Sequence, residues 1–379
     1  MTPKAVLPKK KSVGRGPNAV IACMAACFCL LALDTLLFRT PLYLSILEPD
    51  SSAGLFELIF RRERYAEPSP GRSMVVMLGN SRLAFSQKVL DAQKIDTHFQ
   101  YRSAGVAGST PRMWYYMLRD LDPHQSRYRA VILATDDYDD EDRAYNPNDE
   151  IRDLHYLVAR LRLTDLFDFA FSYEDRALRW QAIRGGLLKG TILQADIQAF
   201  LRNPNHRIEY VKLCNRYYWK WAYDYKETTR NMEGLKIDWS TLAVTLPPGA
   251  GEDERHTVED FLAHPAEPQT GRLSAYRKKW LGRIIESYRN SGTTVIFIRL
   301  PRGPVPRPDG LSKKLTSSIR DFGSLPNVAL ANEHTFDALE HPGLFKDGIH
   351  LNREGITRFS ALLVEEVNRL LETHKAAQP

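Results

Sequence analysis

The sequence has 379 residues, a formal net charge of +6, and apolar and charged residues in the proportions of a globular protein. Its four cysteines exclude a disulfide framework, because three of them fall in one apolar segment and leave Cys214 alone in the rest of the chain. We therefore expect a domain held by its hydrophobic core, with Cys214 as a packed apolar residue. No spacing of cysteine and histidine is typical of a metal site, and the sequence predicts neither a metal or cofactor nor a nucleic-acid partner.

The N-terminus predicts a membrane anchor. Five lysine and arginine residues lie in the first 15 positions, and an apolar run follows over residues 19–38, interrupted only by Asp34 and Thr35. As a helix this run is roughly 30 Å long, the thickness of a bilayer core, and it lacks the shorter apolar core and cleavage site of a signal peptide. We expect a cytoplasmic tail over residues 1–17 and an uncleaved single-pass anchor over residues 18–39, with Asp34 near the interface. The positive flank places the N-terminus inside and everything after it in the periplasm, or another extracytoplasmic space, at the cytoplasmic membrane.

The next part of the chain alternates between predicted strands and helices. Residues 40–72 are expected to be a linker and an entry segment before a domain over residues 73–379. Short apolar runs predict strands, and a helix is expected after Ser86. Thr110 followed by Pro111 predicts the start of another helix. The predicted strands are 74–78, 99–101 and 130–134, and the second helix is expected to continue to Leu121.

The alternation stops at about residue 139 and resumes at about residue 270. Helical periodicity appears between these positions, which predicts an inserted helical subdomain or lid. Asn352 is expected to cap the last helix, whose apolar positions recur at helical spacing. The elements predicted after the insert are helices over 272–290 and 310–321, strands over 293–298 and 328–330, and a final core stripe of Ile356, Phe359, Leu363, Val367 and Leu370. Such alternation is typical of an α/β fold with a parallel sheet and helices on both faces.

Two separated motifs carry the predicted chemistry. Gly79 ends the first strand, so Ser81 is expected where the chain turns from strand to helix, at the carboxyl end of the sheet. Far downstream, Asp347 and His350 lie three residues apart before the last helix. If this loop returns to Ser81, the chain contains a nucleophile, a base and an orienting carboxylate.

The order of these motifs resembles the four blocks of the SGNH/GDSL hydrolase superfamily. The resemblance is carried by residues 79–81, Gly108, residues 136–137 and the Asp347-x-x-His350 pair, and it leaves residues 139–270 unmatched. It implies a flavodoxin-like three-layer α/β/α fold and an ester-processing site. By position, Ser81 would be the nucleophile, His350 the base and Asp347 its orienter, while the backbone N–H groups of Ser81 and Gly108 would form an oxyanion hole.

The third block departs from the family pattern. The family usually has Gly-x-Asn-Asp there, and its asparagine donates to the oxyanion, whereas this chain has Asp136 at that place within residues 134–137. An ionised carboxylate can only accept hydrogen bonds. Three alternatives remain: Asp136 is protonated, another donor such as Thr135 or Tyr138 replaces it, or plain hydrolysis is weak.

Further residues are candidates for substrate contacts. Arg82 is either a solvated helix residue or an anion contact, and Tyr138 lies beside the third block. The aromatic residues around Trp219 and Trp221 either stack on a sugar or pack against a helix or membrane. The acidic run over residues 136–142 lacks the pattern of a calcium loop, which favours a solvated acidic turn.

Anchored proteins of this superfamily often modify cell-surface polysaccharides, so the resemblance implies an O-acyltransferase, most simply for acetyl groups. The polysaccharide would be the acceptor and a multi-pass membrane acyltransferase the partner. One alternative is a carbohydrate or lipid esterase or deacetylase with the same triad. Another is a non-catalytic glycan-binding or assembly subunit.

Overall fold

The computed structural model describes residues 17–86, 92, 95–142, 147–223, 230–264, 270–308 and 315–377. The chain forms two compact units. One contains residues 1–46 and 158–199, and the other contains residues 47–157 and 200–379. We call them the anchor unit and the sheet unit.

The sheet unit is built on five parallel strands. Their order across the sheet is β2-β1-β3-β6-β7, and the register places Val75 of β1 between Tyr101 of β2 and Ala130 of β3. The prediction of these strands is confirmed. β1, β3 and β6 are short and mostly buried apolar runs, whereas β2 also contains polar residues and is buried in part. The strands are β1 (Ser73–Leu78), β2 (Phe99–Ser103), β3 (Ala130–Thr135), β6 (Thr294–Arg299) and β7 (Val328–Leu330).

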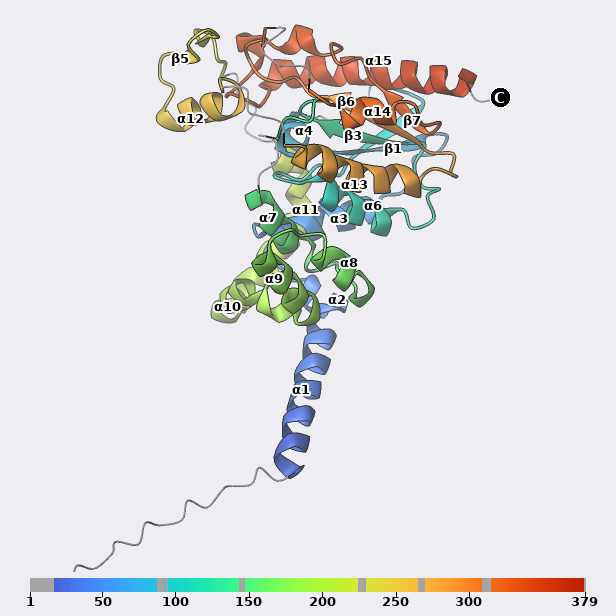
Figure 1. The fold of residues 1–379 in the computed structure, drawn as a ribbon, viewed down its shortest axis with the longest axis vertical. Coiled ribbons are helices and arrows are strands. Elements are labelled where there is room, and N and C mark those ends of the chain that lie inside the picture. The colour runs from blue at the N-terminus through green and yellow to red at the C-terminus, as the bar shows by residue number, and fades with distance from the viewer. Residues whose placement is uncertain are drawn as a thin grey trace, which may run out of the picture. The chain divides into compact units, whose positions relative to one another are not determined.

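Helices cover both faces of this sheet. Figure 1 shows α15 (Arg353–Ala377) on one side and both α6 (Pro111–Leu121) and α13 (Arg272–Ser287) on the other. Phe359 and Leu363 of α15 are fully buried in one core cluster with strand residues, as the helical stripe predicted. The predicted caps are also present. The Thr110 hydroxyl accepts from the N–H of Met113 at 3.4 Å, and the Asn352 side chain accepts from the N–H of Gly355 at 3.1 Å.

The segment over residues 40–72, expected to be a linker, contains packed helices. Here α2 (Pro41–Leu44) is followed by α3 (Ser52–Arg64), which buries Phe56, Ile59 and Phe60. The remaining elements before β6 are α4 (Ser81–Ser86), α7 (Pro147–Leu157), α8 (Leu166–Ala170), α9 (Arg176–Leu187), α10 (Gln194–Arg202), α11 (Pro204–Tyr223), α12 (Glu252–Phe261), the antiparallel pair β4 (Lys236–Asp238) and β5 (Ala243–Thr245), and the 3₁₀ turns η2 (Leu163–Asp165) and η3 (Lys189–Thr191). After β6 come α14 (Ser318–Phe322), η4 (Asp337–Leu339) and η5 (Pro342–Leu344).

The stretch over residues 139–270, expected to be one insert, is divided between the two units. Residues 158–199, with α8, α9 and α10, belong to the anchor unit, and the rest belongs to the sheet unit. The helix expected after Ser86 falls mainly on residues 87–91, outside the described residues, as does much of the helix expected at 310–321.

The anchor unit begins with α1 (Pro17–Phe38), which is long and apolar enough to cross a membrane. Near its carboxyl end Asp34 is buried, and its two carboxylate oxygens accept from the backbone N–H groups of Lys189 at 3.0 Å and Gly190 at 2.8 Å. These groups belong to η3, and the lack of a side chain at Gly190 lets this turn approach α1. A Cβ atom at Gly190 would lie 3.0 Å from the Phe38 ring. Asp34 therefore joins α1 to residues 158–199.

Replacing Asp34 by leucine gives a direct test of this role. The change makes α1 more apolar, yet it leaves one buried and one partly buried N–H group without their acceptor, at a cost of about 1–3 kcal/mol for a buried group. We expect faster amide hydrogen exchange over residues 188–192 of the full-length protein in detergent. Asp34→Asn keeps one acceptor oxygen and should have a smaller effect. Unchanged exchange in Asp34→Leu would contradict the assignment.

Candidate active site

Ser81 lies at the point predicted for it, between a strand and a helix. The strand β1 ends at Leu78, and Ser81 is the first residue of α4. Gly79 allows this turn, because a Cβ atom there would lie 2.6 Å from Cβ of Leu83 and 3.2 Å from Cβ of Ala134. Because β1 lies between β2 and β3, the serine is at the carboxyl end of the strand where the order of the sheet reverses, the usual ligand position in open α/β folds.

Ser81, His350 and Asp347 are brought together, although 269 positions separate the serine from the histidine. The Oγ atom of Ser81 is 3.2 Å from Nε2 of His350, and Nδ1 of His350 is 3.0 Å from Oδ2 of Asp347. An ionised carboxylate can only accept, so Nδ1 carries the proton. In the neutral ring Nε2 is then the acceptor, which is the tautomer needed to take a proton from Ser81.

Backbone hydrogen bonds hold the carboxylate of Asp347 in place. Its Oδ1 atom accepts from the N–H groups of Ile349 at 2.9 Å and His350 at 2.8 Å. Burial opposes ionisation of Asp347, but hydrogen bonding to the His350 ring and to these two N–H groups outweighs it, so the pKa of Asp347 lies below its ordinary value. The carboxylate therefore stays charged and able to orient the imidazole. Next to it, burial lowers the pKa of Lys346 to about 8, although attraction to Asp347 acts in the opposite direction.

The loop that carries Gly108 is bonded to the end of β1. The carbonyl of Gly79, two residues before the serine, accepts from the N–H of Val106 at 3.1 Å and from the hydroxyl of Ser109 at 2.8 Å. Gly108 itself has a φ of +69°, a left-handed conformation that favours glycine. The backbone N–H groups of Ser81 and Gly108 remain the predicted oxyanion donors.

Asp136 acts as an acceptor. Its Oδ2 atom accepts from the side-chain amide of Asn80 at 2.9 Å, and its Oδ1 atom is 3.3 Å from Nη1 of Arg82. Because both neighbours are donors, the two Asp136 oxygens act as acceptors toward them.

Arg82 is a buried structural residue in this arrangement. It is 7 % exposed, so the expectation of a solvated helix position is wrong. Besides Asp136, its guanidinium binds the carbonyl of Arg302, a residue far away in the sequence. A buried charge needs such partners. They hold the Arg82 side chain inside the protein, whereas the sequence left it as a candidate for substrate contact. Sequence reasoning missed the carbonyl of Arg302 as a partner of Arg82, because 220 positions separate the two residues and only the folded chain brings them together.

Tyr138 also lies in the core, which contradicts its prediction as a substrate contact. It is 1 % exposed, and its hydroxyl donates to the carbonyl of Phe297 at 2.8 Å and reaches that of Ala331 at 3.2 Å. Burial is the main reason that its pKa is raised well above the ordinary value. The hydroxyl is therefore committed to the β6–β7 region and is not an oxyanion donor.

The predicted sugar platform cannot be followed in the structure, because the side chains of Trp219 and Trp221 lie outside the described residues. Cys214, which precedes them on α11, is 3 % exposed, and burial raises the pKa of its thiol. The prediction that it is a packed residue is confirmed.

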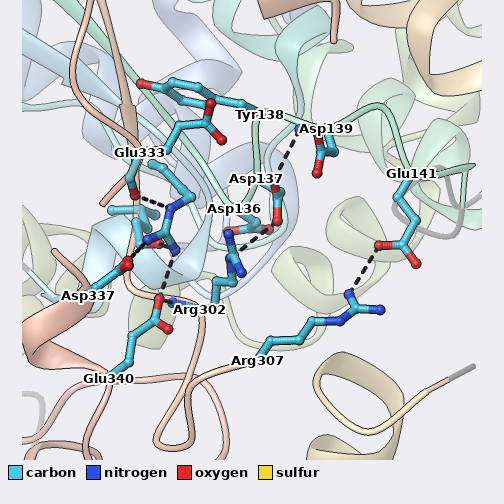
Figure 2. Close-up of polar contacts among 12 residues, drawn as sticks. Asp136, Asp137, Tyr138, Asp139, Glu141, Arg302, Arg307, Glu333, Asp337 and Glu340 are labelled. Atoms are coloured by element: carbon cyan, nitrogen blue, oxygen red, sulfur yellow. Dashed lines mark hydrogen bonds and ion pairs between the residues drawn. The ribbon is translucent and has the colours of Figure 1, made fainter. Parts of the chain in front are cut away.

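The acidic run over residues 136–142 is a set of ion pairs, so the expected solvated turn is wrong. Figure 2 shows Asp137 beside Arg302 and Glu141 beside Arg307, each pair 3.4 Å apart. Asp140 is fully buried and pairs with Arg277 at 3.2 Å. Among the described residues no group of three or more histidine, cysteine and acidic side chains is arranged to hold a metal ion.

A second network of polar contacts surrounds the buried guanidinium of Arg299. Arg299 at the end of β6 is 1 % exposed, and its Nη1 atom donates to Glu340 at 2.8 Å. It also binds Asp337 and the carbonyl of Glu333. The carboxylate of Glu340 accepts from the N–H of Arg302 at 2.9 Å as well. No local sequence signal marks Arg299, because a cation at a strand end is ordinarily solvated.

Comparison with known proteins found no relative. No family model matches the sequence, and no curated protein matches it.

Proposed function

We propose that the chain is a membrane-anchored, extracytoplasmic SGNH-like O-acyltransferase that acts on a cell-surface or exported polysaccharide. The observation that carries this proposal is the hydrogen-bonded chain from Ser81 through His350 to Asp347. The parallel sheet with the order β2-β1-β3-β6-β7 supports the flavodoxin-like three-layer fold implied by the resemblance. The apolar helix α1 supports the anchor.

In the first half of the proposed reaction, His350 takes the proton of the Ser81 hydroxyl while its oxygen attacks an acyl carbonyl. The oxyanion that forms is held by the backbone N–H groups of Ser81 and Gly108, and the loss of one such donor raises a barrier by about 2.7–4 kcal/mol. The tetrahedral intermediate collapses as His350 returns the proton to the leaving group. The product is an acyl ester on Ser81.

In the second half, a glycan hydroxyl takes the place of the leaving group. His350 removes its proton, the glycan oxygen attacks the acyl carbon, and the Ser81 oxygen leaves and recovers the proton. Asp347 stays ionised and orients the imidazole in both steps. Water as the acceptor would make the same site an esterase, so the acceptor decides between the two activities.

The contacts of Asp136 with Asn80 and Arg82 support transfer over rapid hydrolysis. The usual third-block asparagine would add a donor to the oxyanion hole, whereas Asp136 is an acceptor bound by Asn80 and Arg82. A site with fewer donors stabilises the oxyanion less. A bound glycan hydroxyl offsets this loss by its proximity, which water lacks. A multi-pass acyltransferase that brings the acyl group across the membrane is the partner we propose.

The test uses the full-length protein in phospholipid nanodiscs, because Asp34 in the anchor is part of the fold of residues 158–199. Wild type, Ser81→Ala and Ser324→Ala are incubated with p-nitrophenyl acetate, with and without surface oligosaccharides. Ser324 is an exposed serine and serves as the matched control. Mass spectrometry follows acetyl groups on the protein and on the sugar.

We expect an acetyl group on Ser81 that moves to the sugar in wild type and in Ser324→Ala and is absent from Ser81→Ala. Acetate release that is independent of sugar but still lost in Ser81→Ala would replace the transferase with an esterase. Binding of the oligosaccharide without any label on Ser81 would overturn the catalytic proposal and favour a glycan-binding subunit.

A further inference from the structure

The anchor unit exposes large apolar side chains on the helices next to the end of α1. On α8 and just after it, Phe167 is 66 % exposed and Phe171 is 58 % exposed, and on α9 Trp180 is 70 % exposed. These positions are not needed for the unit's own core, because α8 buries Leu166 and Phe169 on its other side. Helices that carry apolar side chains on both their inward and their outward faces present a second apolar surface, which is typical of a site covered by a partner or a membrane.

Local contacts order these exposed rings. Phe167 and Phe171 are one helical turn apart, with their rings stacked and the centroids 6.4 Å from each other. The guanidinium of Arg179 lies 5.1 Å from the centroid of Phe171, and its Nη2 atom donates to the carbonyl of Tyr173 at 2.9 Å. The rings and the cation therefore form a fixed surface of α8 and α9, which we call the aromatic face.

The aromatic face is held close to the membrane span by bonds within one unit. Besides the Asp34 contacts with η3, Arg39 just after α1 donates to the carbonyls of Leu161 at 3.4 Å and Leu187 at 3.3 Å. Leu161 lies five residues before α8, and Leu187 is the last residue of α9. The Tyr43 hydroxyl donates to Asp196 of α10 at 2.5 Å. In Figure 1, α8, α9 and α10 lie at the carboxyl end of α1.

We infer that the aromatic face, formed by Phe167, Phe171, Trp180 and Arg179, lies in the interface of the phospholipid bilayer that α1 crosses. A helix end that leaves the hydrocarbon core places the next elements of its unit at the level of the headgroups. Aromatic rings and arginine side chains are the residues that suit this depth, with the ring among the acyl chains and the guanidinium at the phosphates.

The charge of this segment identifies the kind of lipid contact. Residues 158–199 contain six basic and five acidic side chains, so their net charge is close to zero. The contact is therefore apolar in origin and needs no anionic lipid, in contrast with a polybasic membrane site. The anchor unit would be attached to the bilayer at two places, α1 and the aromatic face, which restricts its rotation about the exit of α1.

The first measurement follows the depth of single fluorophores in the full-length protein. The four native cysteines are replaced by alanine, and an NBD label is attached to Phe171→Cys or Phe261→Cys in phosphatidylcholine vesicles. Phe261 on α12 is the matched control, since it is a phenylalanine with 57 % exposure in the sheet unit. Quenching is measured with lipids that carry a nitroxide near the headgroup or near the chain end.

We expect the label at position 171 to be quenched several-fold more strongly than the label at 261, and more by the shallow nitroxide than by the deep one. High salt should not change this result. A label at 171 that is as solvent-accessible as the label at 261 would overturn the inference and leave the aromatic face to a protein partner.

A second measurement avoids the cysteine substitutions. Wild type and Trp180→Phe are reconstituted in vesicles of brominated phosphatidylcholine, and the difference between their tryptophan emissions gives the contribution of Trp180. We expect that contribution to be lost to bromine quenching and to return in unbrominated vesicles. Equal emission from Trp180 in both vesicles would contradict a place in the interface, whatever the enzymatic activity of the protein.

Discussion

Asp347→Asn is expected to lower the rate of acyl transfer by about four orders of magnitude while the protein stays folded. The Asp347 carboxylate fixes the His350 ring with Nδ1 protonated, since its Oδ2 atom lies 3.0 Å from that nitrogen. An asparagine amide at this position can donate to Nδ1, which places the ring proton on Nε2. His350 then cannot accept the proton of Ser81, and the imidazolium that forms in the reaction loses its counter-charge.

The measurement is the rate of acetyl-Ser81 formation in the full-length protein, with unfolding followed in parallel. Asp337→Asn is the matched control, because Asp337 also contacts a histidine three residues away, Nδ1 of His334 at 2.7 Å. That pair is exposed, and Arg299 keeps Glu340 when Asp337 is changed. If Asp347→Asn reacts as fast as Asp337→Asn, the triad is not the catalytic group.

Asp140→Ala is expected to lower the free energy of unfolding by about 3–5 kcal/mol, the effect of removing one partner from a buried ion pair. Asp140 is fully buried, and its Oδ2 atom accepts from the backbone N–H of Ser318 at 2.7 Å and from the Ser318 hydroxyl at 2.8 Å. Its Oδ1 atom pairs with Arg277, which is 6 % exposed and would keep a buried charge without this counter-ion.

Asp139→Ala is the control for that prediction, because it removes the adjacent carboxylate. Asp139 pairs at 2.7 Å with Arg320, whose side chain is 44 % exposed and which also binds Glu333. A partly exposed pair contributes about 1 kcal/mol or less. Urea unfolding of the full-length chain in detergent, followed by tryptophan fluorescence, measures both variants. Equal losses of unfolding free energy in the two variants would show that the buried ion pair of Asp140 contributes no more to stability than the partly exposed pair of Asp139.

The strands and the capped helices could be predicted from the sequence because their signals are local. Buried parallel strands appear as short apolar runs, and β1, β3 and β6 each begin and end within two residues of the prediction. Thr110 and Asn352 are marked as caps by their own residue type and by the helical residues directly after them. The pairing of Ser81 with the distant Asp347 and His350 was only a conditional prediction, implied by the resemblance of their order to the SGNH/GDSL blocks, because no local signal places the two motifs together.

Residues whose role depends on distant partners could not be assigned in this way. Arg82 and the acidic run were expected to be solvated because charged side chains usually are. Arg82 binds the carbonyl of Arg302, and Asp140 pairs with Arg277. Both partners lie far away along the chain. Tyr138 was a candidate substrate contact because it adjoins the third block, and only the packing of β6 and β7 shows that its hydroxyl is used in the core.

The first helix, α1, also has features that the sequence determines and others that only the tertiary structure determines. Composition and length alone determined that α1 is apolar enough to span a bilayer, because hydropathy adds up residue by residue along a helix. The tertiary structure decided that Asp34 belongs to the fold of residues 158–199, since its partners are backbone N–H groups about 150 positions away. Backbone donors carry no residue-specific signal, so hydrogen bonds to them are visible only in the folded chain.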